Sequence, residues 1–388
     1  MKICIYSHQF LPTIGGVQAH TVRLAASLAA SGHTVAVVTR TPGEHSYDAR
    51  FAFRVHRRPT VLGLMQAIAS CQVLHLNTWS VLVALTARAL GKPMLWFHHD
   101  YDLACPKSIA WNGYRCHFHP IGCTQCLARD HAPSQIGRRF AAFSVRRTLH
   151  GLVNAHAVHT PFVAERLQWP QALVLGFGTG NGQHDSDDPA PESEKLGRAK
   201  DPGVLLVGRL IAEKGVDVLI RALRYVHDAG VDLHVTIVGD GPERVRMARL
   251  ATSLGVEQSV SFYGEAGPHE AIELMEQSTC VVLPSAWDEP TGYVAVEAMD
   301  MGVPVVAARV GGLAGVVSQH GLLFERGDAL DLSRQLLTLK AQPDLRDHLV
   351  QSGKQHAQAQ HDWRALGHDY ARVYARLAAG LHMGQSPA

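Results

Sequence analysis

Two carboxylates, Glu289 and Glu297, lie on either side of one turn of the chain. The apolar run 280–283 before the turn predicts a strand, and Thr291-Gly292 predicts the start of a helix. Free backbone N–H groups and the helix dipole favour anions at such a start, and a glycine lets a ligand approach the backbone closely. Because carboxylates repel phosphate, we expect the two Glu side chains to accept hydrogen bonds from hydroxyls instead. A nucleotide sugar offers both kinds of group.

A second cluster of charge follows the apolar run 204–207, where Arg209 and Lys214 flank a short loop. Arginine offers a planar fork to phosphate oxygens and lysine a compact charge, so the pair is suited to one diphosphate. Taken alone, either residue would more simply be interpreted as a charged side chain on a solvated turn. The sequence therefore predicts a diphosphate site without a metal, since no Asp-x-Asp motif follows a predicted strand.

In the first half, His98 and His99 follow the predicted strand 93–97. A histidine at the carboxyl end of a parallel strand is well placed for substrate contact, and alternation lets only one of the two face a ligand. Alternation does not decide between His98 and His99, and Asp100 lies beside them. Further upstream, Gly15-Gly16 joins strand 2–7 to helix 17–31, and this pair fits a ligand-lined turn and a plain glycine turn equally well.

Four of the seven cysteines fall within 22 residues, in a Cys-rich insertion at 105–126. The four are Cys105, Cys116, Cys123 and Cys126. Their spacing suits a closed structural zinc site, with disulfides as the rival, and a closed four-thiolate site excludes a catalytic metal. No other cofactor is expected.

Apolar strands alternate with helices along most of the chain, which predicts an α/β protein with doubly wound parallel sheets. The polar, Gly- and Pro-rich segment 178–202 is a predicted linker between domains at 1–177 and 203–362. Residues 363–388 are expected to form a helix that returns to the first domain, followed by a tail.

The net charge of +2 conceals two oppositely charged halves. Residues 1–177 hold 17 Lys/Arg against 6 Asp/Glu, and residues 178–388 hold 19 against 28. A basic first half favours an anionic or lipid-linked acceptor, and the basic segment 136–149 fits either contact with an anionic membrane or a solvated helix. No nucleic-acid motif accompanies the charge. With no apolar run of eighteen residues, we expect a cytoplasmic protein that could be peripheral on the inner face of the membrane.

Several of these motifs together resemble retaining glycosyltransferase family 4. The resemblance rests on Glu289, seven residues and Glu297, then Gly302-Val-Pro-Val-Val306, and on Gly208-Arg209 with Glu213-Lys214-Gly215 upstream. The loop 309–313 also resembles the family, although Ala314-Gly315 stands where relatives usually have Pro-Glu.

The resemblance implies a GT-B fold, in which two Rossmann-like domains face each other across a cleft, and a hexosyl transfer from a nucleoside diphosphate sugar to a hydroxyl. It implies that Glu289 orients the sugar, that Glu297 holds the ribose, and that His99 supports the sugar. Arg209 and Lys214 would stabilise the leaving diphosphate. The implied substrate-binding set is Gly15, Gly16, Asp100, Gly264, Pro284, Thr291, Gly292, Tyr293, Val294 and Glu297.

Two alternatives stay open at this point. One is a nucleotide-sugar epimerase on the same fold, which would convert its donor without an acceptor. The other is an inactive nucleotide-sugar-binding scaffold, although such a protein has no need to keep Arg209, Lys214, Glu289 and Glu297 together. The sequence names neither the sugar, the base, the acceptor nor the oligomeric state.

Overall fold

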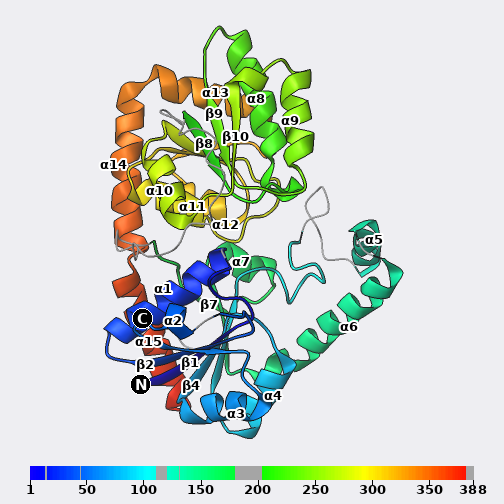
Figure 1. The fold of residues 1–388 in the computed structure, drawn as a ribbon, viewed down its shortest axis with the longest axis vertical. Coiled ribbons are helices and arrows are strands. Elements are labelled where there is room, and N and C mark those ends of the chain that lie inside the picture. Colours follow the sequence, from blue (N-terminus) through cyan, green and yellow to red (C-terminus); the bar gives the residue numbers. More distant parts are fainter. Residues whose placement is uncertain (14, 44, 111–119, 131, 180–202, 382–388) are drawn as a thin grey trace. The chain divides into compact units, whose positions relative to one another are not determined.

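The computed structural model describes residues 1–13, 15–43, 45–110, 120–130, 132–179 and 203–381 (Figure 1). The described residues form two compact units, and the chain changes unit after Gly178 and again after His361. The first unit therefore holds residues up to Gly178 and those from Asp362 onward. The predicted linker 178–202 lies almost wholly outside the described residues.

The first unit is built on a seven-stranded parallel sheet, ordered β3-β2-β1-β4-β5-β6-β7. Its strands are β1 (Lys2–Ser7), β2 (Thr34–Thr39), β3 (Arg54–Arg57), β4 (Val73–Leu76), β5 (Met94–His98), β6 (Ala155–Val158) and β7 (Leu173–Val174). Its helices are α1 (Gly16–Ala30), α2 (His45–Asp48), α3 (Val61–Ser70), α4 (Val81–Ala89), α5 (Pro120–Asp130), α6 (Pro133–Leu149), η1 (His150–Leu152), α7 (Pro161–Arg166) and α15 (Trp363–Ala378). Strand order reverses between β1 and β4, which is where ligands bind in sheets of this kind.

The last helix, α15, closes the core of the first unit. Trp363, Tyr370 and Tyr374 recur at helical spacing and are buried against the sheet and α1. Gly367 allows α15 to approach α1 closely, because a Cβ there would lie 2.1 Å from Ser27 Oγ. Ser27 Oγ in turn donates a 2.6 Å hydrogen bond to the carbonyl of Trp363. The structure thus places the C-terminal helix on the first unit.

The second unit is a six-stranded parallel sheet, ordered β10-β9-β8-β11-β12-β13. Its strands are β8 (Val204–Val207), β9 (Val235–Val238), β10 (Val260–Gly264), β11 (Cys280–Leu283), β12 (Val305–Ala308) and β13 (Leu322–Phe324). Its helices are η2 (Ala212–Lys214), α8 (Val216–Asp228), α9 (Arg244–Ser253), η3 (Glu257–Ser259), α10 (Pro268–Glu276), α11 (Tyr293–Asp300), α12 (Gly311–Val317), α13 (Ala329–Ala341) and α14 (Pro343–Gln360). Here the reversal falls between β8 and β11, so the loops after these two strands meet at the switch point.

In the described part of the chain, no helix combines the length and the apolar character needed to cross a membrane.

Candidate active site

At the switch point of the second unit, the structure joins Lys214 to Glu289. Lys214 Nζ donates to Glu289 Oε1 at 2.9 Å and to Oε2 at 3.1 Å. Ser285 Oγ and Trp287 Nε1 donate to Oε2 at 2.8 and 2.9 Å. The carboxylate side chain is only 16% exposed, so it is not part of a solvated turn. Oε1 accepts from Lys214 alone among these donors, which leaves it with room for a ligand hydroxyl.

The charge state of Glu289 follows from these contacts. Burial by itself raises the pKa of a carboxyl group, but the charge of Lys214 and the hydrogen bonds from Lys214, Ser285 and Trp287 outweigh burial, so the pKa of Glu289 is lowered. Glu289 is therefore ionised at neutral pH and acts as a hydrogen-bond acceptor.

Glycines hold the surrounding loops against each other. Gly215 has a left-handed φ of 64°, and a Cβ at this position would lie 1.9 Å from the carbonyl oxygen of Pro284. The neighbouring backbone is tied in the same place, since Ala286 N donates to the carbonyl of Glu213 at 2.8 Å. The start of α12 closes the other side, where Gly312 N donates to the carbonyl of Glu289 at 2.7 Å. The carboxylate therefore sits in a rigid frame.

The other predicted donor-site residues surround this pair. Arg209 directly follows Gly208 at the end of β8, is exposed, and has no side-chain hydrogen bond or ion pair with any described residue. Glu297 is half-buried on the second turn of α11, and Tyr293 and Val294 are half-buried on its first turn. Thr291 is buried.

Gly292 caps α11 in close contact with α12. Its φ of −170° is extended, which any residue can adopt, whereas a Cβ would lie 2.9 Å from Leu313 Cδ1 of α12. No side chain caps this helix start. Gly264 ends β10 with a φ of 88°, and its carbonyl accepts from Gly239 N at 2.6 Å, so it serves a turn between neighbouring strand ends.

In the first unit, His99 belongs to a chain of hydrogen bonds at the carboxyl ends of β4, β5 and β6. His99 Nε2 lies 2.9 Å from Asn77 Oδ1, and His159 Nε2 lies 2.9 Å from His99 Nδ1. Asn77 Oδ1 also lies 2.7 Å from His75 Nε2, whose Nδ1 is 2.6 Å from Tyr374 Oη on α15. The network therefore links the predicted site histidine to the C-terminal helix.

One set of proton positions satisfies this network. The carbonyl oxygen of Asn77 can only accept, so His75 and His99 each carry a proton on Nε2. His75 Nδ1 then accepts from the Tyr374 hydroxyl, and His99 Nδ1 accepts from His159 Nε2. Burial lowers the pKa of His75 to about 4 and that of His159 to about 3, and it lowers the pKa of His99 well below its usual value. All three rings are neutral at pH 7.

The two adjacent histidines point into different surroundings. His98 is buried, with Nδ1 2.9 Å from Asp102 Oδ1 and Nε2 2.9 Å from His156 Nδ1. His99 is half-buried and turns to the Asn77 network. The strand alternation predicted this division, and of the two only His99 keeps partial exposure at the sheet edge. Asp100 accepts from the backbone of Asp102, and its burial raises its pKa well above the usual carboxyl value.

Gly15 and Gly16 lie at the start of α1, near the carboxyl end of β1. Gly15 caps the helix with an extended φ of 167°, and a Cβ there would lie 2.7 Å from Gln18 Oε1. Gly16 is exposed. The pair does occupy the helix start that the sequence predicted, and its contact with a ligand stays a prediction.

The structure describes three of the four clustered cysteines. Cys116 lies outside the described residues, while Cys105, Cys123 and Cys126 are buried. Within the described residues no three His, Cys, Asp or Glu side chains form a group that could hold a metal ion, so these residues do not support the predicted zinc site. A site that includes Cys116 stays a prediction.

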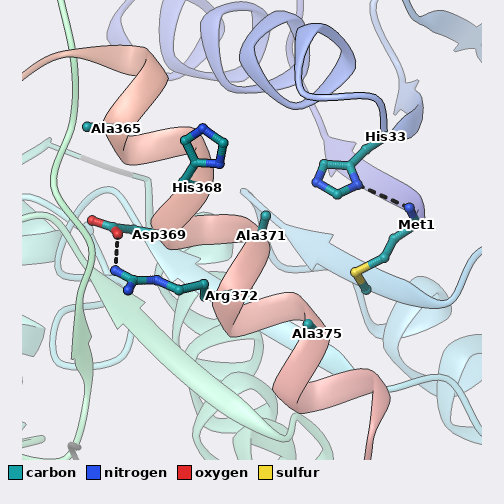
Figure 2. Close-up of a pocket in the computed structure, with 8 residues that line it drawn as sticks. All are labelled: Met1, His33, Ala365, His368, Asp369, Ala371, Arg372 and Ala375. Atoms are coloured by element: carbon teal, nitrogen blue, oxygen red, sulfur yellow. Dashed lines mark hydrogen bonds and ion pairs between the residues drawn. The ribbon is translucent and has the colours of Figure 1, made fainter.

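A hollow of about 570 Å³ lies elsewhere in the first unit, between α15 and the starts of β1 and β2 (Figure 2). Met1 and His33 line one side, and Asp369 pairs with Arg372 on the other. This is the amino edge of the sheet, opposite the strand ends that carry His99, and the hollow contains none of the predicted site residues.

Sequence reasoning missed several residues that contact the predicted ones. Asn77 and His159 are the first residues after β4 and β6, and the rule that selected His99 after β5 would have found both. Ser285 and Trp287 lay inside the predicted loop without an assigned role. Asp288, which pairs with Arg326 from the turn after β13, had no local signal at all.

Comparison with known proteins places the chain in a family. Residues 14–170 match the model of Glycosyltransferase Family 4, and residues 190–356 match that of Glycosyl transferases group 1. The chain therefore belongs to the group 1 glycosyltransferases of family 4.

Individual relatives span nearly the full chain. A GDP-mannose-dependent monoacylated α-(1-6)-phosphatidylinositol monomannoside mannosyltransferase of Corynebacterium glutamicum is 26% identical and covers 94% of this chain and 96% of its own. Glycogen synthase of Mycobacterium tuberculosis is 25% identical, with coverage of 99% and 97%. Among solved structures, Anabaena HepE in complex with UDP and glucose has a TM-score of 0.72 at 19% identity, with coverage of 97% and 99%. The predicted GT-B fold class is confirmed.

Proposed function

We propose that the protein transfers a hexosyl unit, with retention of configuration and without a metal, from a nucleoside diphosphate sugar to an acceptor hydroxyl. The observation that carries this proposal is the ionised Glu289 clamped by Lys214, Ser285 and Trp287 at the switch point of the second unit. Relatives named as a GDP-mannose-dependent mannosyltransferase and as glycogen synthase support a sugar donor of this class.

Different residues bind the diphosphate, the sugar and the ribose of the donor. Arg209 and the N–H groups at the start of α11 bind the diphosphate, and Lys214 shares its charge between the diphosphate and Glu289. Glu289 Oε1 accepts from a hydroxyl of the donor sugar, and Glu297 accepts from the ribose. Two cations and a helix start offset the charge that develops on the leaving group, which is why no metal is needed.

In the reaction, the acceptor oxygen bonds to the anomeric carbon on the face from which the diphosphate departs. The bond from that carbon to the phosphate oxygen breaks, and the departing oxygen takes the acceptor proton. Both ring nitrogens of His99 are hydrogen-bonded within the protein, one to Asn77 and one to His159. His99 therefore contacts a sugar hydroxyl by giving up one of these two hydrogen bonds.

The test begins with the donor. We expect one nucleoside diphosphate sugar among the common UDP and GDP sugars to raise the melting temperature, because a ligand that binds only the folded state stabilises it. Incubation with that donor and candidate acceptors in EDTA should then give a product whose anomeric configuration, read by NMR, matches the donor. Conversion of the donor without an acceptor would instead identify an epimerase, and binding without turnover would identify a scaffold.

For the acceptor side we propose peripheral contact with the anionic inner face of a membrane through α6. This 17-residue helix has no buried residue, carries four arginines and has no acidic residue. Arg138 and Arg139 are exposed, and Phe140 and Phe143 are half-buried on one stripe with Ile136.

The variant Arg138→Glu/Arg139→Glu should bind vesicles of phosphatidylserine and phosphatidylcholine at least about tenfold more weakly than wild type, since each basic residue near such a surface contributes about 1 kcal/mol. Sedimentation with the vesicles measures this. Arg246→Glu, on α9 of the second unit, is the control. Equal binding of wild type and the α6 variant would refute the contact.

A further inference from the structure

Three basic residues form a row at the carboxyl edge of the first sheet. In the register of β1, β2 and β3, Ser7 lies opposite Thr39 and Thr39 opposite Arg57. The next residues along the three strands are His8, Arg40 and Arg58. Backbone hydrogen bonds continue the alignment past the strand ends, from Arg40 N to the carbonyl of His8 at 3.3 Å and from Arg58 N to the carbonyl of Thr39 at 2.8 Å.

Arg58 holds a conformation that its side chain disfavours. Its φ is 44°, in the left-handed region that glycine adopts more readily. Residues kept in such a conformation gather at ligand sites. Arg58 Nε donates to the carbonyl of Arg40 at 3.0 Å, which fixes one edge of the guanidinium, and the residue is exposed.

The neighbouring Arg57 shows what a structural arginine looks like at the same place. It forms an ion pair with Asp48 and donates to the carbonyls of Leu11, Thr41 and Pro42. In contrast, no carboxylate in the described ranges pairs with Arg40 or Arg58, and both are exposed. The row therefore presents two positive charges without a described counter-ion.

His8 completes the row at the switch point between β1 and β4. Its backbone N donates to Thr78 Oγ1 at 2.8 Å, and its Nδ1 lies 3.3 Å from Tyr6 Oη, so the half-buried ring is held in place. Burial lowers the pKa of His8, and the charge of Arg40 lowers it further, so the ring is neutral at pH 7.

We propose that His8, Arg40 and Arg58 bind a phosphate group carried by the acceptor. The inference rests on the proposed transfer reaction. Two guanidinium groups carried by neighbouring strand ends offer forked donors to phosphate oxygens, and a neutral imidazole adds one N–H. β2 is three strands away from β5, where His99 lies, which is about 14 Å at the usual strand spacing. The phosphate is therefore remote from the reacting hydroxyl, as on a lipid headgroup or an extended phosphorylated glycan.

The test compares inorganic phosphate binding in three variants by NMR titration of backbone amides. Arg40→Gln/Arg58→Gln should weaken binding at least about tenfold, because each lost guanidinium removes charge-assisted hydrogen bonds. Arg54→Gln, on the same strand β3 but at its opposite end, should bind as wild type does. Arg58→Gly should weaken binding while leaving the melting temperature unchanged or higher, since glycine accepts this φ.

Wild-type protein without saturable shifts near Arg40, or equal losses in the Arg54 control, would overturn the site. Vesicles of phosphatidylinositol and phosphatidylcholine identify the source of the phosphate. If the double variant binds these vesicles more weakly than wild type, the phosphate belongs to a lipid headgroup. If the double variant loses inorganic phosphate binding but binds the vesicles as wild type does, the phosphate belongs to a soluble phosphorylated glycan.

Donor-induced melting shifts, which depend on the second unit, are measured in the same samples. No donor shift with intact phosphate binding would refute the transfer reaction but keep the phosphate site. A donor shift and sugar transfer without any effect of Arg40 or Arg58 would refute the phosphate site alone.

Discussion

Glu289→Gln is expected to lower kcat/KM for sugar transfer by about 10²–10³-fold, the usual cost of removing one preorganised polar contact to a transition state. The amide keeps the size of the side chain but removes the charge that pairs with Lys214 at 2.9 Å. It also replaces one acceptor oxygen with a donor: when the amide oxygen keeps the hydrogen bonds from Trp287 and Ser285, its NH2 group faces the Lys214 ammonium. Lys214 is then free to bind the diphosphate alone, so donor binding should weaken less than turnover.

The matched control is Glu276→Gln. Glu276 is exposed at the end of α10, four residues before β11, so it lies at the amino edge of the same βα unit. Its kcat/KM should stay within about twofold of wild type, as for surface substitutions away from a site. Steady-state kinetics measure kcat/KM of both variants, and circular dichroism checks that both are folded. Full activity of Glu289→Gln would remove Glu289 from the site.

The buried histidines of the first unit should make it unstable in mild acid. Burial lowers the pKa of His75 to about 4 and those of His156 and His159 to about 3, against 6.5 in the unfolded chain. Between these values the unfolded state binds more protons than the folded state, so stability falls as the pH falls. The contribution is fully present above pH 6.5 and is lost on acidification toward pH 4 for His75 and toward pH 3 for His156 and His159. For His75 alone it amounts to about 3 kcal/mol.

Hydrogen exchange of the β4 and β5 amides between pH 7 and pH 5 measures this loss as a change in opening free energy. In His75→Gln the slope of the opening free energy against pH should fall by about 1.4 kcal/mol per pH unit, which is the contribution of one proton. His368→Gln, an exposed position on α15, should leave the slope unchanged. A first unit whose stability at pH 5 equals that at pH 7 would show that these rings accept protons without unfolding.

Much of the fold was readable from local patterns. β11 begins and ends at the residues of the predicted strand 280–283, and β5 is shifted by one residue at each end from the predicted 93–97, because strands buried in a parallel sheet appear as short apolar runs. The edge strand β7 is only Leu173–Val174, where a single neighbour pairs with it. Loops after these strands held the candidate residues, as the rule for open α/β sheets requires.

The amino-acid sequence by itself determined the two parallel sheets, the family and the turn that carries Glu289 and Glu297, since these depend on patterns a few residues long. Only the tertiary structure joined Lys214 to Glu289, 75 positions apart, and His75 to Tyr374, 299 positions apart. The row formed by His8, Arg40 and Arg58 likewise exists only through strand register. Such contacts arise when distant strands end at one sheet edge, and no local pattern of residues encodes which side chains then meet.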